Sequence, residues 1–128
     1  MKEALFDTSA VIALVHERLE VDDPPELVAI SIVTLCELHH GVLAASDAKR
    51  PVRLRTLDWV RHNCDTLPAG NEVAPRYGQL MAEAQRATGA RPDAGDTIIA
   101  ATAMVCGLPV LTRDRDFEAF RGVDVVFV

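Results

Sequence analysis

The chain has 128 residues, of which 49% are hydrophobic and 25% are charged. These proportions fit one globular domain and exclude intrinsic disorder. Acidic residues outnumber basic residues by 19 to 13, giving a formal net charge of −6. A protein that binds nucleic acid through its overall field should be basic, so work on a polyanion would need metal ions or a local arginine cluster.

Short apolar runs alternate with segments of helical spacing along the chain. In chain order we expect a strand at 4–6, a helix at 10–15, a strand at 27–30, helices at 32–45 and 48–63, a strand at 66–67, helices at 71–88 and 94–106, a strand at 108–111, a helix at 114–120 and a strand at 123–128. This order predicts a single-domain α/β fold, 1–128. Three layers are expected, with a mostly parallel five-stranded sheet covered by helices on both faces.

Local signals support several of these boundaries. Ser31 and Asp93 are suitable N-caps, and Gly107 follows the last apolar position of the helix at 94–106. In the helix at 48–63, Leu54, Leu57 and Val60 are expected on the inner side.

The three cysteines show no spacing typical of a zinc site, and an odd number argues against a disulfide framework. Cys36, Cys64 and Cys106 each lie among apolar residues, so we expect buried thiols. The first residues do not resemble a signal peptide, and the longest apolar stretches fall short of the roughly 20 residues that a membrane span needs. We therefore expect a cytoplasmic protein that is not bound to a membrane.

Acidic residues follow the strands at the places where ligands bind in open α/β sheets. Asp7 comes directly after the first strand, and Asp114 and Asp116 come after the strand at 108–111. Glu37 and Asp96 lie in the early turns of two helices. Four carboxylates gathered at one edge would raise each other's pKa, and a divalent cation would remove that cost. Oxygen ligands suit Mg²⁺ or Mn²⁺, so the sequence predicts a site for one of these ions.

Each acid also has a purely structural interpretation. Thr34 and Glu37 have the spacing of a capping box, and so do Asp93 and Asp96. Asp114 and Asp116 would suit the N-terminus of the last helix. These alternatives remain open at the level of sequence, although both Glu37 and Asp96 lie in strongly apolar helices.

Four short motifs in this chain resemble those of the PIN domain family, and within it the VapC-type toxins of bacterial toxin–antitoxin pairs. The motifs are Phe6-Asp7-Thr8-Ser9-Ala10, Ser31-Ile32-Val33-Thr34-Leu35-Cys36-Glu37-Leu38, Asp96-Thr97-Ile98-Ile99-Ala100-Ala101-Thr102-Ala103 and Leu111-Thr112-Arg113-Asp114-Arg115-Asp116-Phe117. Each is weak alone, but the four occur in the right order and at fitting spacing.

The resemblance implies an endoribonuclease that depends on Mg²⁺ or Mn²⁺. By that analogy Asp7 and Asp96 are the principal metal ligands, and Glu37 and Asp114 complete the catalytic acids, directly or through waters. Activated water would attack the scissile phosphorus without a covalent protein intermediate. Thr8 or Ser9, together with Thr112, would orient the ligands or water. Asp116 is a second acid that the fourth motif offers to the site. Arg113 and Arg115 would contact the RNA backbone. The family also implies a homodimer and a cognate antitoxin.

Other protein classes fit less well. A response-regulator receiver shares the sheet and the acidic Mg²⁺ pocket, but it needs a lysine near the last strands, and the only lysines are Lys2 and Lys49. A haloacid-dehalogenase-type phosphatase would need a second aspartate where Ser9 stands. No GxGxxG motif supports a dinucleotide site. A catalytically inactive PIN-like scaffold remains an alternative.

Overall fold

The computed structural model describes residues 1–16 and 18–128. Its elements are β1 (Glu3–Phe6), α1 (Thr8–Val15), β2 (Leu27–Ser31), α2 (Ile32–Ala44), α3 (Arg50–Asn63), β3 (Asp65–Leu67), α4 (Val73–Thr88), α5 (Ala94–Cys106), β4 (Val110–Thr112), the 3₁₀ helix η1 (Arg115–Ala119) and β5 (Val125–Phe127). The expected order of strands and helices is confirmed. The main difference is the last helix, which is a short 3₁₀ segment.

The five strands form one sheet in the order β3-β2-β1-β4-β5, and every pairing between neighbours is parallel. Phe6 in β1 lies opposite Ile30 in β2 and Leu111 in β4. The chain first builds the β2–β3 side of the sheet and later returns to add β4 on the other side of β1. The gap between the ends of β1 and β4 is therefore the topological switch point, where open α/β sheets bind ligands.

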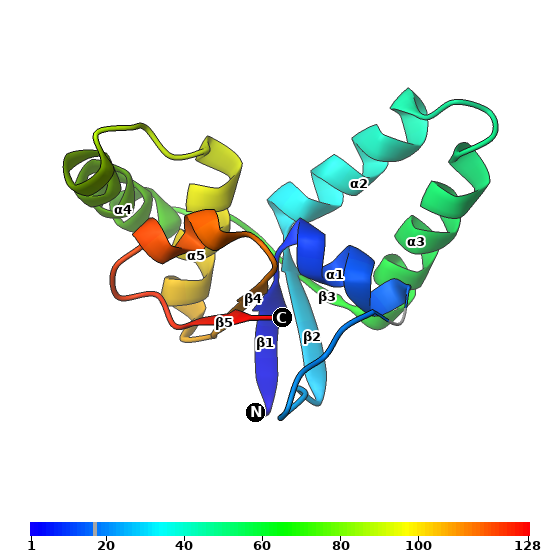
Figure 1. Ribbon diagram of the computed structural model, residues 1–128, viewed down its shortest axis with the longest axis horizontal. Helices are drawn as coiled ribbons and strands as arrows, with labels where there is room; N and C mark the ends of the chain where they lie inside the picture. The colour runs from blue at the N-terminus through cyan, green and yellow to red at the C-terminus, as the bar shows by residue number, and fades with distance from the viewer. Residues whose placement is uncertain (17) are drawn as a thin grey trace.

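Helices cover both faces of this sheet (Figure 1). Successive side chains of a strand point to opposite faces. Leu5 accordingly packs with residues of α4 and α5, whereas Phe6 packs with residues of α1, α2 and α3. Each of these two side chains is fully buried. The predicted three-layer α/β architecture is confirmed.

Side-chain caps fix the starts of three helices near the carboxyl edge of the sheet. Asp7 accepts from the Ala10 amide, Ser31 from the Val33 amide and Asp93 from the Asp96 amide. Each contact satisfies a backbone donor that has no partner within its helix. At the other end of α5, Gly107 has φ +67°, a left-handed conformation that ends the helix at the predicted position.

Two expectations about individual side chains are wrong. Leu54 is 44% exposed, whereas Leu57 and Val60 are buried as expected and Thr56 joins them on the inner side of α3. The cysteines are free thiols, but Cys36 and Cys106 are exposed and Cys64 is only partly buried. Apolar neighbours in the sequence did not predict burial because α2 and α5 each turn one side to solvent.

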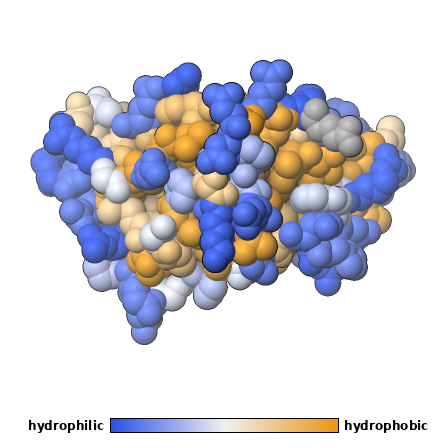
Figure 2. Space-filling model, turned by 90° about the horizontal axis from the view of Figure 1, so that it is seen from below, coloured by the Kyte–Doolittle hydropathy of each residue, from blue (hydrophilic) through white to orange (hydrophobic). Residues whose placement is uncertain are grey.

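The surface at the amino-terminal side of the sheet is partly hydrophobic and partly hydrophilic. Figure 2 views the molecule from the side on which the N-terminus lies in Figure 1, and hydrophobic areas there are broken up by hydrophilic side chains. Leu27, at the start of β2, is 49% exposed. Of the helices that the structure describes, none combines the length and the apolar character needed to cross a bilayer.

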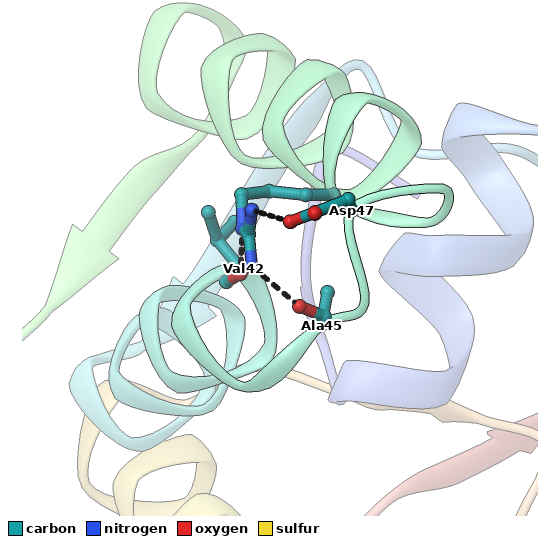
Figure 3. A network of polar contacts seen from close by, with 4 residues as sticks. Val42, Ala45 and Asp47 are labelled. Carbon is teal, nitrogen blue, oxygen red and sulfur yellow. Dashed lines mark hydrogen bonds and ion pairs between the residues drawn. The ribbon is translucent and has the colours of Figure 1, made fainter.

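Arg50 makes several of the contacts that hold the turn between α2 and α3. The Arg50 guanidinium donates to the Asp47 carboxylate (2.7 Å) and to the carbonyls of Ala45 (2.6 Å) and Val42 (3.4 Å), the three partners labelled in Figure 3. Two of these acceptors are carbonyls of the last turn and C-cap of α2, where helical donors run out; the Val42 carbonyl also accepts from the Ala45 amide (3.3 Å). Arg50 thereby fixes how α2, the helix that carries Glu37, leads into α3.

Candidate active site at the carboxyl edge of the sheet

Asp7 is the most firmly held acid at this edge. Its carboxylate accepts hydrogen bonds from the Ala10 amide (2.9 Å), the Ser9 hydroxyl (2.8 Å) and the Thr112 hydroxyl. The side chain is only 4% exposed. Burial raises the pKa of Asp7, the three hydrogen bonds work against that rise, and the negative charge of Asp114 adds to it. The fold thus places a carboxylate in a buried position with its orientation already set.

Thr112 connects Asp7 to the loop after β4. Its hydroxyl donates to Asp7 and accepts from the Asp114 amide (2.9 Å). The Asp114 carboxylate in turn accepts from the Asp116 amide (2.9 Å) and caps η1. The Ser9 hydroxyl also crosses the gap, since it accepts from the Arg113 amide (3.1 Å). The two strand ends at the switch point are therefore joined by hydrogen bonds that run through hydroxyl groups.

The geometry distinguishes between the two acids of the fourth motif. The charge of Asp114 raises the pKa of both Asp7 and Asp96. Asp116 is exposed and lines a neighbouring hollow that it shares with Asp96. Asp114 is thus the acid whose charge acts on Asp7 and Asp96, and it is also the cap of η1, while its catalytic role stays a prediction.

Glu37 reaches the same edge from α2. The helix begins at Ser31, so Thr34 and Glu37 lie inside it, and the capping-box interpretation of Glu37 is wrong. Its pKa is raised mainly by desolvation and further by the charges of Asp93 and Asp7, while a hydrogen bond from Thr8 lowers it. Glu37 is exposed rather than embedded among apolar side chains.

Asp96 is where the charges of the cluster add up. Burial raises its pKa to about 7, together with the charges of Asp93, Asp114, Asp7 and Glu37, in that order. The charges of the other three predicted catalytic acids therefore all raise the pKa of this one side chain. Asp93 provides the N-cap of α5, as predicted, and Asp96 is left with its carboxylate facing the cluster.

A close approach of α5 to α2 makes this meeting possible. A Cβ atom at Gly95 would lie 3.1 Å from Asp93 Oδ1, 3.4 Å from Val33 Cγ1 and 3.8 Å from Glu37 Oε1. Asp93 was expected only as a cap, but its charge acts on both Glu37 and Asp96. The sequence signal that could have indicated this was its three-residue spacing from Asp96.

The cluster has no counter-charge in the part of the chain that the structure describes. The ion pairs found there join Met1 to Asp23, Arg50 to Asp47 and Arg115 to Glu118, all outside the four predicted acids. Within 1–16 and 18–128, no three carboxylate, imidazole or thiolate groups are already arranged to hold a metal ion. The four acids are neighbours, but an ion would have to pull their carboxylates closer together in order to be coordinated by three of them.

The two predicted RNA-contacting arginines have protein partners. The Arg113 guanidinium donates to the Arg18 carbonyl. Arg115 pairs with Glu118 (3.1 Å) and stacks over the Phe127 ring at 4.1 Å from its centroid. Both side chains are exposed, and their contact with RNA stays a prediction.

Two hollows flank the acids. One, of about 620 Å³, lies between the α4–α5 loop and η1 and reaches Asp96. The other, of about 400 Å³, lies among α1, α2 and α3 and includes Thr8 and Glu37. The acids therefore stand between two hollows that are open to solvent.

Comparison with known proteins identifies the family. A model of the PIN domain family matches residues 4–123. Ribonuclease VapC5 of Mycobacterium tuberculosis is 39% identical over 121 residues, which cover 92% of this chain and 87% of that protein. Ribonuclease VapC4 of the same organism is 31% identical over 132 residues, covering 100% and 98%. The crystal structure of VapBC-5, a member of the VapBC family of toxin–antitoxin systems from M. tuberculosis, superposes with a TM-score of 0.80 at 37% identity and covers 100% of this chain and 98% of that one. This chain therefore belongs to the PIN domain family, and its relatives include VapC ribonucleases.

Proposed function

We propose that this protein is a metal-dependent endoribonuclease and the toxin of a VapBC-type toxin–antitoxin pair. The observation that carries the proposal is the meeting of Asp7, Glu37, Asp96 and Asp114 at the switch point without a counter-cation among the described residues. The names of the relatives support the same activity.

The donor set fits Mg²⁺ or Mn²⁺ in kind. All four predicted ligands offer carboxylate oxygens, the donors that these hard cations prefer. The pKa of Asp96 is raised to about 7 by burial first and by the neighbouring carboxylates second, and a bound cation would offset both costs. Since no three groups among the described residues are arranged around a common point, the acids would close in when the ion binds.

A bound divalent ion would polarise the scissile phosphate and acidify a water molecule. The protein's own groups then have separate tasks. Asp7, held by Ser9 and Thr112, would keep a fixed carboxylate at the reacting end of the sheet. Either Glu37 or Asp114 would accept the proton of the attacking water, as a carboxylate acting as general base does. Asp96 would complete the ligand set from the opposite helix.

An antitoxin protein is the proposed partner. The structurally similar VapBC-5 chain was crystallised as a member of a toxin–antitoxin family. The hollow among α1, α2 and α3 offers Ile12, Leu38 and Val52 beside Glu37, so a partner seated there would also cover that acid. We further propose a homodimer, which light scattering of the purified protein would test.

The decisive experiment is cleavage of a panel of tRNA and other structured RNAs. Purified protein would be assayed with Mg²⁺, with Mn²⁺ and with EDTA, beside an Asp7→Asn variant. Metal-dependent cutting that the variant lacks is expected. If neither ion supports cutting and calorimetry detects no binding of Mn²⁺, the protein is an inactive scaffold and the proposal is wrong.

A further inference from the structure

A second hollow lies beside the one that reaches Asp96, and none of the four predicted catalytic acids lines it. The first lies between the α4–α5 loop and η1, and the second, also about 620 Å³, lies along α4. Ala87 and Arg121 line both of them, so the two hollows are adjacent, and together they are called the channel below. This channel begins at the acid cluster, and it is open to solvent along its length.

Three exposed arginines stand along this channel. Arg91 lines the first hollow, Arg86 the second, and Arg121 both. None of the three takes part in an ion pair or side-chain hydrogen bond within the part of the chain that the structure describes. The fourth arginine of the channel, Arg115, differs because it is paired with Glu118 and stacked on Phe127. Arg86, Arg91 and Arg121 thus keep their full donor capacity.

The channel also contains acids. Asp93 and Asp96 belong to the cluster itself, Glu118 is paired with Arg115, Glu83 accepts from the uncharged Gln79 amide (3.3 Å), and Asp116 is exposed. The lining therefore carries both signs of charge, with five acids beside four arginines. What distinguishes the channel is that three of its arginines have no side-chain partner among the described residues.

The loop that carries Arg91 is anchored. The Thr88 hydroxyl donates to the Ala84 carbonyl (2.8 Å) and accepts from the Ala90 amide (3.2 Å), and Gly89 ends α4 in a left-handed conformation with φ +75°. The base of the Arg91 side chain is thereby fixed relative to α4. An arginine on a fixed backbone loses less entropy when it binds a ligand than one on a loose loop.

We propose that this channel binds the RNA strand on one side of the cleaved bond, with Arg91 and Arg121 each contacting a backbone phosphate and Arg86 extending the row. The guanidinium group matches a phosphate with two parallel hydrogen bonds, and successive phosphates of one strand call for successive cations. This inference rests on the proposed ribonuclease function and adds a path for its substrate.

The test compares two double variants that lose the same charge. Arg91→Ala/Arg121→Ala removes the channel arginines, and Arg55→Ala/Arg61→Ala removes two exposed arginines of α3, on the other face of the sheet. Fluorescence anisotropy with a labelled single-stranded RNA of mixed sequence, in Ca²⁺ and at several salt concentrations, gives the affinity and its salt dependence. Gel analysis checks that the RNA stays intact.

The channel variant is expected to bind RNA at least about 10-fold more weakly than the wild type. The slope of log affinity against log salt should fall by about 1.4, since each single-strand phosphate contact contributes about 0.7. In cleavage assays KM should rise while kcat is nearly unchanged. The control variant should match the wild type in RNA affinity, salt slope, KM and kcat. Thermal melting should show that both variants are folded.

Two other results would overturn the inference, and they are distinguishable. If the wild type cleaves RNA but the channel variant keeps its affinity and salt slope, the RNA takes another path and only this inference fails; the arginines would then be available to an acidic protein partner. If the wild type neither binds nor cleaves RNA with Mg²⁺ or Mn²⁺, the proposed function fails, and the channel fails with it.

Discussion

The acid cluster has two halves that are built differently. The strand-end acids, Asp7 and Asp114, follow β1 and β4 and are joined through the Thr112 hydroxyl. The helix acids, Glu37 and Asp96, are carried by α2 and α5, and no side-chain hydrogen bond crosses directly between these two carboxylates in the described chain. The first half is positioned by hydrogen bonds, and the second by the packing of helices.

This difference explains why the neighbouring negative charges raise the pKa of Asp96 so strongly. Hydrogen bonds to Asp7 favour its charged form and partly offset the effect of burial. Asp96 has no such side-chain bond among the causes acting on its pKa, so burial and four neighbouring charges raise it to about 7. Under the proposed metal dependence, the strand-end half would be positioned before an ion binds, whereas an ion would relieve the unfavourable charge of the helix half.

The largest expected effect comes from breaking the strand-end half. Asp7→Asn should lower metal-dependent cleavage by more than about 100-fold, because even groups that only support a metal ligand cost 10–100-fold. Asparagine is as good an N-cap as aspartate, so the free energy of unfolding should change by less than about 1 kcal/mol. RNA cleavage in Mg²⁺ and urea unfolding measure the two effects.

The control for Asp7→Asn is Asp58→Asn, which neutralises an exposed acid of α3. It should leave both cleavage and stability unchanged. Full activity in the Asp7 variant would show that this carboxylate is not part of the catalytic site.

The helix half should reveal itself in the pH dependence of stability. An acid whose pKa is raised in the folded state keeps its proton there at a pH where the unfolded chain has lost it. The free energy of unfolding of the metal-free protein is therefore expected to fall as the pH rises from about 4 to about 7. Above about pH 7 the contribution of Asp96 should stay constant. Asp96→Asn should remove this loss while also abolishing cleavage. Urea unfolding in EDTA across this pH range measures it.

Adding Mn²⁺ should reverse this pH dependence of stability. Because the ion binds the deprotonated carboxylate, it should stabilise the wild type more at pH 8 than at pH 5, and the Asp96→Asn variant much less at either pH. If stability in EDTA is the same from pH 4 to 8 in wild type and variant, Asp96 is not a site of accumulated charge.

A smaller effect should follow from cutting the link within the strand-end half. Thr112→Val removes the donor to Asp7 and the acceptor of the Asp114 amide, and Thr112 is fully buried. The loss of stability should be about 1–3 kcal/mol, and the loss of activity about 10–100-fold. Unfolding curves and initial rates of cleavage measure the two.

Thr102→Val is the matched control for Thr112→Val. Thr102 is equally buried, but its hydroxyl donates only to the Ile98 carbonyl within α5 (2.7 Å). Activity should be unaffected there, with a stability loss of no more than about 1 kcal/mol. Equal activity losses in the two variants would mean that the effect of Thr112 is structural.

The two halves also differ in how far the sequence predicted them. Asp7 and Asp114 were placed correctly because an acid directly after a buried parallel strand has only one edge to occupy. The order of elements was predictable for the same reason, since strand and helix periodicities alternate without interruption. Glu37 and Asp96 were correctly expected near this edge, but spacing alone could not separate capping from site chemistry at either position.

What the sequence could not supply was the distance between helices. The role of Asp93 depends on how closely α5 approaches α2, and the exposure of Leu54 and Cys36 depends on which side of α3 and α2 faces solvent. These quantities follow from tertiary packing, which local patterns do not encode.

The smallest effect, and the sharpest probe of helix packing, is expected at Gly95. In Gly78→Ala the added Cβ meets nothing within 4 Å, so this exposed position in the interior of α4 should gain up to about 1 kcal/mol from helix propensity alone. In Gly95→Ala the same atom would lie 3.1 Å from Asp93 Oδ1 and 3.4 Å from Val33 Cγ1. The crowding should cancel most of the gain, and α5 should shift from α2 by a few tenths of an ångström.

Such a shift would move Asp96 relative to Glu37 while leaving Asp7, Thr112 and Asp114 in place. Gly95→Ala is therefore expected to lower cleavage several-fold with little change in unfolding free energy, whereas Gly78→Ala should raise stability with unchanged cleavage. Urea unfolding and cleavage rates, measured for both variants, test this. Gly95→Ala could instead gain as much stability as Gly78→Ala and cleave RNA normally. In that case the spacing of α5 and α2 does not affect catalysis by Glu37 and Asp96. The two halves of the cluster would then differ only in their hydrogen bonds.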